Sequence, residues 1–485
     1  MDARRETRRR PCAAPLALLL AMTACSVGPN YVRPSAPVET TYKELAGWKQ
    51  AEPRDHLPRG PWWERYGDAK LSELEEQVPA ANQDLVQAAA RYREAQALVA
   101  NAKAAWWPTV TIGVSTTRAR QSATLGTSFA SGKTTSDYAM PLEATWELDL
   151  WGRIRRNVES NEASAQGSAA DLENTRLSLQ SALAVNYFQL RSLDAQGRLF
   201  DETIATYEKS LRLTQSRYKW GVASGGDVAV AATQLESTRA LATDVALSRA
   251  QLEHAIAVLI GVPAGEFSLA VEPLAATPPE IPVGVPSELL ERRPDVATFE
   301  RNAAAANAQI GVAKAAYYPT VSLGASGGLE STHAADWFTW PSRFWAVGPS
   351  VTETIFDGGA RGALTAQARA VYDEQVGAYR QSVLAAFQNV EDQLAALRML
   401  EDESQQQDAA VAAARDATRI TYERYKAGTA SYLDLAILQT SEFNNERTAA
   451  DLMGRRMVAS VLLIQALGGG WSTEDLPTRQ DVASD

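Results

Sequence analysis

The chain contains the stretch Lys103-Ala-Ala-Trp106-Trp107-Pro108-Thr109-Val110, which returns as Lys314-Ala-Ala-Tyr317-Tyr318-Pro319-Thr320-Val321. Each copy ends an Ala-rich helical pattern and begins a segment in which polar and apolar residues alternate. A repeat of about 200 residues is too long for one unit of a solenoid. The sequence therefore predicts a duplicated half-protein.

Further matches between the halves keep nearly the same spacing. They pair Gly152 with Gly359, Arg217-Tyr218-Lys219 with Arg424-Tyr425-Lys426, Gly221 with Gly428, Ser224 with Ser431, Asp227 with Asp434, and Gly261 with Gly468. We expect the first repeat at residues 68–262 and the second at 287–470, joined by a Pro-rich connection at 263–286. A strap at 25–67 precedes them, and a polar tail at 471–485 is expected to be disordered.

The composition limits the possible classes of protein. Of 485 residues, 45% are hydrophobic and 22% charged, which is typical of a folded chain. The formal net charge of −11 argues against a nucleic-acid partner. Beyond the N-terminus no apolar run reaches about 18 residues, so we expect no helical membrane span in the mature chain.

The first 24 residues have the order of a secretory signal, with arginines, then an apolar run, then small residues. Met22-Thr23-Ala24-Cys25 resembles a bacterial lipobox, which implies cleavage before Cys25 and acylation of that residue. Alternatively, Cys25 is only a small residue near a cleavage site. Cys12 would leave with the signal, so an acylated Cys25 leaves no free thiol for disulfides or catalysis.

The periodicity predicts four helical segments in the first half and three in the second. They cover 68–78, 82–105, 152–219 and 227–260, and the second half has counterparts at 287–316, 359–426 and 431–467. The segments 152–219 and 359–426 contain no proline. A helix of this length would extend about 100 Å, so it needs a coiled-coil partner.

Between the helices the period changes to two, which predicts β-hairpins at about 108–149 and 319–356. Met140, Leu142 and Ala144 alternate with Glu143 and Thr145, giving one apolar and one acidic or polar face. This alternation is typical of strands in an outer-membrane barrel. Four strands in one chain cannot close such a barrel, so the pattern requires an oligomer.

In this order, the segments resemble the TolC-like outer-membrane efflux proteins, in the lipid-anchored branch that serves resistance-nodulation-division pumps. The resemblance rests on Cys25-Ser-Val-Gly28-Pro29-Asn30-Tyr31, Trp62-Trp63, Ser287-Glu-Leu-Leu-Glu-Arg-Arg293-Pro294-Asp295, Phe356-Asp357-Gly358-Gly359, and two Arg-Tyr-Lys-x-Gly turns. It implies a homotrimer with a 12-stranded β-barrel and an α-helical tunnel, in the outer membrane of a Gram-negative bacterium. It also implies a duct for small toxic compounds, with a periplasmic adaptor and an inner-membrane pump as partners.

The resemblance places the two turns at the periplasmic tip, where such proteins close and meet the adaptor. The candidate gate and adaptor-contact residues are Arg217, Tyr218, Gly221, Asp227, Arg424, Tyr425, Gly428, Ser431 and Asp434. Helix capping explains the same pattern, because Ser224-x-x-Asp227 and Ser431-x-x-Asp434 have the spacing of capping boxes. Whether the two aspartates gate a pore or only cap helices stays open at this stage.

Aromatic residues gather in the sequence where helix changes to strand. Trp106, Trp107, Trp146, Trp151, Tyr317 and Tyr318 are candidates for a membrane interface, where one edge of a ring meets lipid and the other meets water. Alternatively, they fill the junction between helices and barrel.

No catalytic or metal-binding pattern occurs, since His56, His254 and His333 show no ligand spacing, and we expect neither an enzyme nor a cofactor. Two alternatives remain at this stage: the duct of a polypeptide-exporting type I system, and a lipid-anchored periplasmic coiled-coil scaffold.

Overall fold

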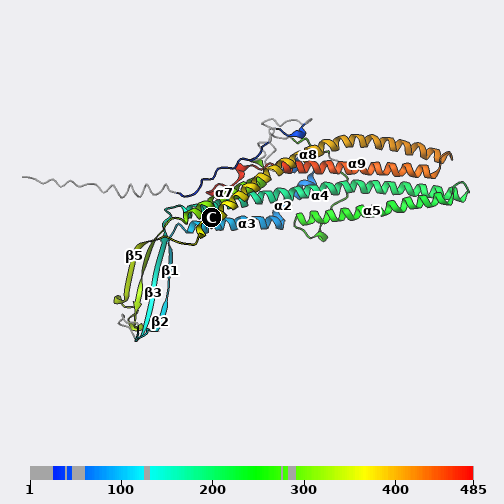
Figure 1. Cartoon of the computed structure of the whole chain (residues 1–485). Helices are drawn as coiled ribbons and strands as arrows, with labels where there is room; N and C mark the ends of the chain where they lie inside the picture. Colours follow the sequence, from blue (N-terminus) through cyan, green and yellow to red (C-terminus); the bar gives the residue numbers. More distant parts are fainter. Residues whose placement is uncertain are drawn as a thin grey trace, which may run out of the picture.

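The molecule is a long bundle of helices that carries a β-sheet at one end (Figure 1). This computed structural model describes residues 26–38, 41–45, 61–124, 132–274, 277–281 and 291–483. The combination of long helices with an antiparallel sheet, in which β1 and β2 together make one of four strand positions, confirms the predicted fold class.

The two halves contain helices of equal length. Helices α3 (Gln83–Ala104) and α7 (Pro294–Ala315) have 22 residues each, α4 (Arg153–Lys219) and α8 (Ala360–Lys426) have 67, and α5 (Gly225–Leu259) and α9 (Tyr432–Ala466) have 35. Helices α3 and α5 lie end to end along α4, and α7 and α9 lie along α8 in the same way (Figure 1). The matching lengths confirm the duplication.

Glycine at special backbone angles fixes both ends of the long helices. Gly152 and Gly359 precede α4 and α8 with φ of 80° and 91°. Beyond the other ends, Gly221 and Gly428 have φ of 72° and 79°, a left-handed conformation that side chains disfavour. The glycine punctuation in the sequence thus predicted these boundaries to within one residue.

The sheet joins both halves of the chain. It consists of β1 (Thr109–Ile112), β2 (Ser115–Arg120), β3 (Thr134–Glu147), β4 (Thr320–Ser331) and β5 (Arg343–Thr352), all antiparallel. Strands β1 and β2 pair in one register with β3 and form a single strand, which is interrupted opposite Pro141 because proline has no N–H to donate.

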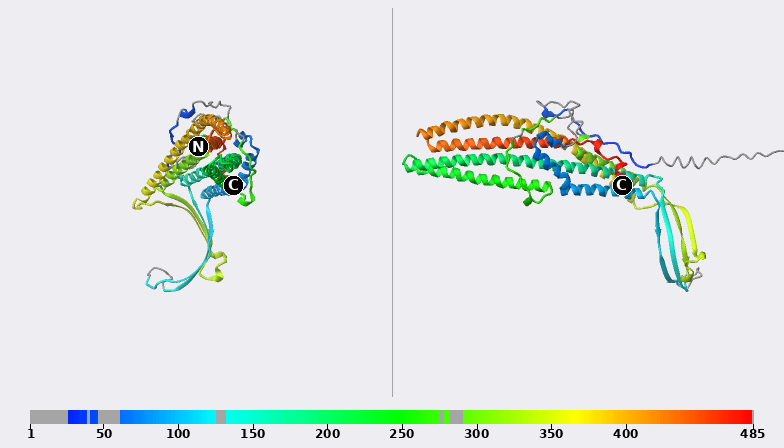
Figure 2. Two further views of the ribbon diagram at one scale, coloured as in Figure 1. Left: turned by 90° about the vertical axis from the view of Figure 1, so that its right-hand side faces the viewer. Right: turned by 180° about the vertical axis from the view of Figure 1, so that it is seen from behind.

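The order β1/β2–β3–β4–β5 leaves the first and last strands as bare edges. Figure 2 shows that the sheet curves like part of a barrel wall. Because lipid cannot satisfy the backbone groups of an open edge, this sheet requires further copies of the chain to close.

The main core lies midway along the bundle, where α2 (Ala69–Ala81), α4, α8 and α9 meet the short turn η3 (Trp62–Tyr66). Trp62 is 1% exposed, and the Tyr66 ring lies 4.8 Å from that of Phe188 on α4. The paired tryptophans of the strap therefore anchor it to the helices. Within the described ranges, no helix combines the length and apolarity that a membrane span requires.

Two sequence predictions differ from the structure, and a third cannot be compared with it. Helix α2 continues through Pro79 to Ala81, because the proline costs only one backbone hydrogen bond so near the helix end. Helix α7 begins at Pro294, a residue whose fixed φ suits the first helical position, and residues 291–292 just before it are also helical. The predicted helix start at 287 lies outside the described residues, so it stays a prediction.

The polar tail is not disordered, which is the second difference. It runs from the end of α9 back toward the sheet, and the Val482 side chain, 1% exposed, packs with Ala95, Val99 and Ala165. The amide of Gln166 donates a hydrogen bond of 3.0 Å to the carbonyl of Pro477. One buried apolar side chain and local capping bonds therefore order a segment whose composition suggested disorder.

Candidate functional site

The two helix turns lie together at the end of the bundle far from the sheet (Figure 1). Each has the predicted capping box: Ser224 and Asp227 cap α5, and Ser431 and Asp434 cap α9. Hydrogen bonds from the Ser431 side chain and backbone lower the pKa of Asp434 below its usual value. Both carboxylates thus serve as helix caps. Capping alone accounts for their contacts within one chain.

The two turns are connected by Arg217 and Tyr425, which we call the tip contact. The Arg217 guanidinium donates a hydrogen bond to the carbonyl of Tyr425 and lies 4.5 Å from the centre of its ring. The Tyr425 hydroxyl shares a hydrogen bond of 3.0 Å with Thr214. The first half of the chain therefore holds the second at the tip.

The corresponding residues in the duplicate do not repeat this contact. Tyr425 is 3% exposed, whereas its counterpart Tyr218 is 54% exposed. Trp220 and Ile437 at the same end are 81% and 59% exposed. Large apolar side chains left in the open indicate a surface that meets another protein.

The two faces of the sheet differ sharply in polarity. Side chains alternate along a strand, and residues paired in the register point to the same face. The face that we call the apolar face carries Val110, Ile112, Val114, Tyr138, Met140, Leu142, Ala144, Trp146, Val321, Leu323, Ala325, Leu329, Trp345, Val347 and Val351. The opposite, polar face carries threonines and serines with Asp137, Glu143, Glu147 and Glu330.

The aromatic candidates gather where the helices meet the sheet. The Trp146 indole N–H donates to the carbonyl of Trp106, and that of Trp151 donates to the carbonyl of Pro319. The Trp151 ring stacks on Tyr318 with centres 4.8 Å apart. Trp107 and Tyr317 remain 74% and 45% exposed. The structure thus brings the six residues to one level of the molecule, here called the aromatic collar.

The strap begins at this collar. The backbone N–H of Val27 donates to the carbonyl of Trp151, and Ser26 lies against Gly152, where a Cβ would come within 2.9 Å of its hydroxyl oxygen. Cys25, the predicted lipidation site, lies outside the described residues.

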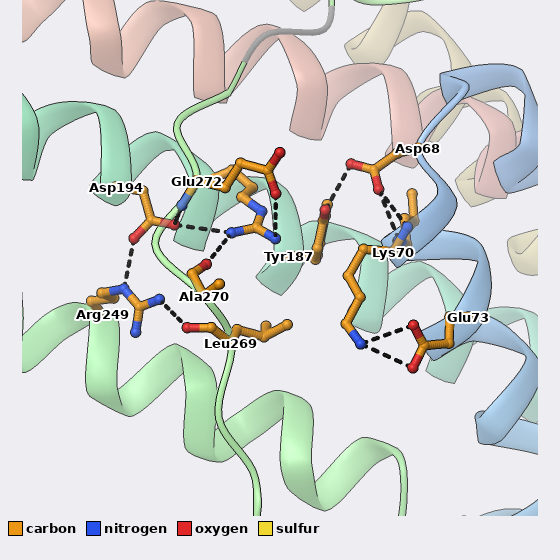
Figure 3. A network of polar contacts seen from close by, with 11 residues as sticks. Asp68, Lys70, Glu73, Tyr187, Asp194, Arg249, Leu269, Ala270 and Glu272 are labelled. Carbon is orange, nitrogen blue, oxygen red and sulfur yellow. Dashed lines mark hydrogen bonds and ion pairs between the residues drawn. The ribbon is translucent and has the colours of Figure 1, made fainter.

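A buried charge network attaches the Pro-rich connection between the halves to helices α4 and α5 (Figure 3). The Asp194 side chain is fully buried and accepts hydrogen bonds from Arg191, Arg249 and the backbone N–H of Glu272. Arg249 also donates to the carbonyl of Leu269. Because these charged groups pair with one another and with backbone groups, we assign the network to stability rather than chemistry.

Sequence reasoning did not identify this network, or Thr214 in the tip contact. The i,i+3 spacing of Arg191 and Asp194 was a weak signal, since most such pairs are solvated. Among the described residues, no group of three His, Cys, Asp or Glu side chains could hold a metal ion.

Comparison with known proteins places the chain in a clear context. The model of a family described as outer membrane efflux protein matches residues 74–262 and 285–469. The outer membrane protein OprJ of Pseudomonas aeruginosa is 31% identical over 470 residues, which cover 96% of this chain and 97% of OprJ. TtgC of Pseudomonas putida, a probable efflux pump outer membrane protein, is 31% identical over 94% of this chain and 95% of its own length.

Solved structures agree with these matches. The outer-membrane channel OprN has a TM-score of 0.86 with 30% identity, covering 92% of this chain and 100% of that chain. The open state of the MtrE outer membrane channel of Neisseria gonorrhoeae has a TM-score of 0.80 with 27% identity, covering 94% and 100%.

Proposed function

The chain belongs to the outer membrane efflux protein family, and from that premise we propose how its residues serve an exit duct. It is the outer-membrane channel of a tripartite efflux pump in a Gram-negative bacterium. The homotrimer works with a periplasmic adaptor and an inner-membrane resistance-nodulation-division pump. Family members are channel proteins, and we propose that this one likewise performs no catalysis.

The observation that carries this function is the sheet with two different faces. Its apolar face suits lipid, its polar face suits a water-filled lumen, and its two bare edges suit pairing with neighbouring copies. Three copies give a closed barrel of twelve strands, and helices of about 100 Å continue it into the periplasm. Solutes then cross without meeting lipid.

We propose that the polar face favours cations. Asp137, Glu143, Glu147 and Glu330 are the only charged residues on this face of the described strands. Three-fold symmetry repeats them around the lumen, and rings of carboxylates attract cations into a pore.

We propose that the tip contact holds the periplasmic end closed. It joins the turns at residues 217–225 and 424–432, and an iris-like opening would separate them. Arg217, Tyr425 and Thr214 carry the contact, while the glycines Gly221 and Gly428 shape the turns. In this proposal Asp227, Ser431 and Asp434 keep the turns rigid, and the exposed apolar side chains beside them receive the adaptor.

We propose that acylated Cys25 anchors the strap in the inner leaflet. The support is the position of Ser26 and Val27 at the aromatic collar, the level at which tryptophan and tyrosine meet a membrane surface. A Cys25→Ser variant should lose the mass of the acyl chains while the trimer remains in the membrane through its barrel. Equal masses of wild type and variant would refute the anchor.

The exported compounds are proposed to be small organic molecules. The relatives are described as antibiotic, toluene and pyoverdine export proteins, which favours a small-molecule pump over the polypeptide duct. The test is accumulation of a fluorescent pump substrate in cells that lack the gene. We expect higher accumulation, restored by the wild-type gene; unchanged accumulation together with loss of a secreted polypeptide would contradict the proposal.

A further inference from the structure

The charged residues of the described strands sort completely by face. All charged residues on the polar face are acidic, namely Asp137, Glu143, Glu147 and Glu330. All charged residues on the apolar face are basic, namely Arg118 and Arg120 on β2 and Arg343 on β5. The register fixes this assignment, because Arg118 pairs with Ser136 in the row of Tyr138 and Leu142, and Arg343 pairs with Leu329.

The three arginines lie at the end of the apolar face that is far from the helices. On β1/β2 the face runs through Val110, Ile112 and Val114 before it reaches Arg118, and on β5 it runs from Val351 through Val347 to Arg343. Both arginines therefore stand eight positions along the strand from the first apolar residue at the collar.

This separation matches the height of a membrane. Eight residues extend about 27 Å along a strand, which a tilt of about 40° reduces to about 21 Å, against an apolar band of about 25 Å in outer-membrane barrels. The collar marks one boundary of that band, so the arginines lie at the other, at the level of the outer-leaflet head groups.

Among the described residues, no carboxylate lies within ion-pair distance of Arg118, Arg120 or Arg343. The Arg343 guanidinium carbon lies 3.2 Å from the centre of the exposed Trp340 ring. Trp345, two positions along the strand on the same face, is also exposed. A guanidinium held against a ring keeps its N–H donors free for an anion, and its planar fork suits phosphate.

The three arginines also occupy the two edges of the sheet. Arg118 and Arg120 are on the first edge strand, and Arg343 is on the last. When copies close the barrel, the last strand of one chain meets the first strand of the next, so each of the three seams brings together arginines from two chains.

We propose that these arginines form a binding site for the phosphate groups of lipid head groups in the outer leaflet. The ligand class is a phosphorylated glycolipid, whose acyl chains lie along the apolar face while its phosphates meet the guanidinium groups. The site would hold lipid at the seams between chains. This inference rests on the proposed function, because it requires the barrel to span the outer membrane.

The experiment measures how many lipid A molecules, each with two phosphates, the detergent-purified trimer retains, by native mass spectrometry. The variant Arg118→Gln/Arg120→Gln/Arg343→Gln is compared with Arg212→Gln/Arg419→Gln/Arg455→Gln, which removes the same charge from exposed helix positions. We expect about fivefold weaker retention for each arginine lost from the strands, and no change in the helix control. Added salt should weaken retention by wild type, because exposed charges are screened.

Three results would overturn the proposal. In the first, the strand variant retains as much lipid A as wild type. In the second, wild type retains dephosphorylated lipid A as well as it retains lipid A. In the third, inorganic phosphate at the same concentration as the lipid displaces all of the bound lipid A. The last two comparisons need no variant, so a folding defect cannot obscure them. Channel conductance, measured on the same samples, distinguishes failure of the lipid-site proposal from failure of the proposed channel function. Normal conductance with unselective lipid binding would refute only the lipid-binding site.

Discussion

Replacing Arg217 by glutamine should loosen the closed tip. The change removes the guanidinium that donates to the Tyr425 carbonyl and covers its ring at 4.5 Å. Tyr425 keeps its hydrogen bond to Thr214, so the turn itself should remain folded. The perturbation is therefore confined to the contact between the two halves of the chain.

The magnitude follows from the two lost interactions. A hydrogen bond from a charged donor contributes about 1.5–3 kcal/mol, and a cation–π contact at a partly exposed site about 0.5–1 kcal/mol. Arg217 is half-buried, so we add the lower values of the two ranges and obtain a loss of about 2 kcal/mol for each chain. This corresponds to a change of about 30-fold in the closed-to-open ratio of one tip.

The assay is open probability in single-channel recordings from planar bilayers. The duplication supplies a matched control, because Arg424 stands at the equivalent position and, within the described residues, makes no such contact with Tyr218. Arg217→Gln should open far more often than wild type, and Arg424→Gln should behave like wild type. Equal effects of both variants, or no effect of either, would refute the assignment of the gate to the tip contact.

Three further predictions concern charge. Asp194→Ala leaves Arg191 and Arg249 buried without their shared partner, so the free energy of unfolding should fall by about 3 kcal/mol. Circular dichroism should then show a lower midpoint of thermal unfolding, and an unchanged midpoint would contradict the role given to the network. Glu75 is fully buried and has no hydrogen-bond partner among the described residues, and burial raises its pKa well above 4.5. The neutral form therefore stabilises the fold at low pH, and this stability is lost as pH rises toward the folded-state pKa. Glu75→Met should remove up to about 1.4 kcal/mol per pH unit of that dependence, seen as thermal midpoints that differ less between pH 5 and pH 8; midpoints that vary as in wild type would count against it. Asp137→Asn with Glu143→Gln and Glu330→Gln should lower the cation preference of the pore, measured as a reversal potential nearer zero in a salt gradient, whereas an unaltered potential would place selectivity elsewhere.

The helices were predictable because single residues mark their ends. Gly152 and Gly221 bound α4, Gly359 and Gly428 bound α8, and no proline interrupts either helix. The alternation of β3 similarly revealed a strand with two different faces. These are local signals, which a sequence displays directly.

The contacts between halves could not be predicted in the same way. Arg217 and Tyr425 are 208 positions apart, and only packing of the two turns shows that the first covers the second while Tyr218 stays exposed. The role of Arg118 and Arg343 depends on strand register, since a shift of one residue would move each to the other face. The order of the tail depends on one buried valine, Val482, whose site is built from other segments.

The central claim is that three copies of this chain form a gated duct through the outer membrane. The most direct test is planar-bilayer conductance of the detergent-purified protein, with cross-linking to count its subunits. We predict a trimer with cation-selective conductance that is low in wild type and rises in the Arg217→Gln variant. A monomer that is soluble without detergent, or a trimer that never conducts even without the tip contact, would contradict the account.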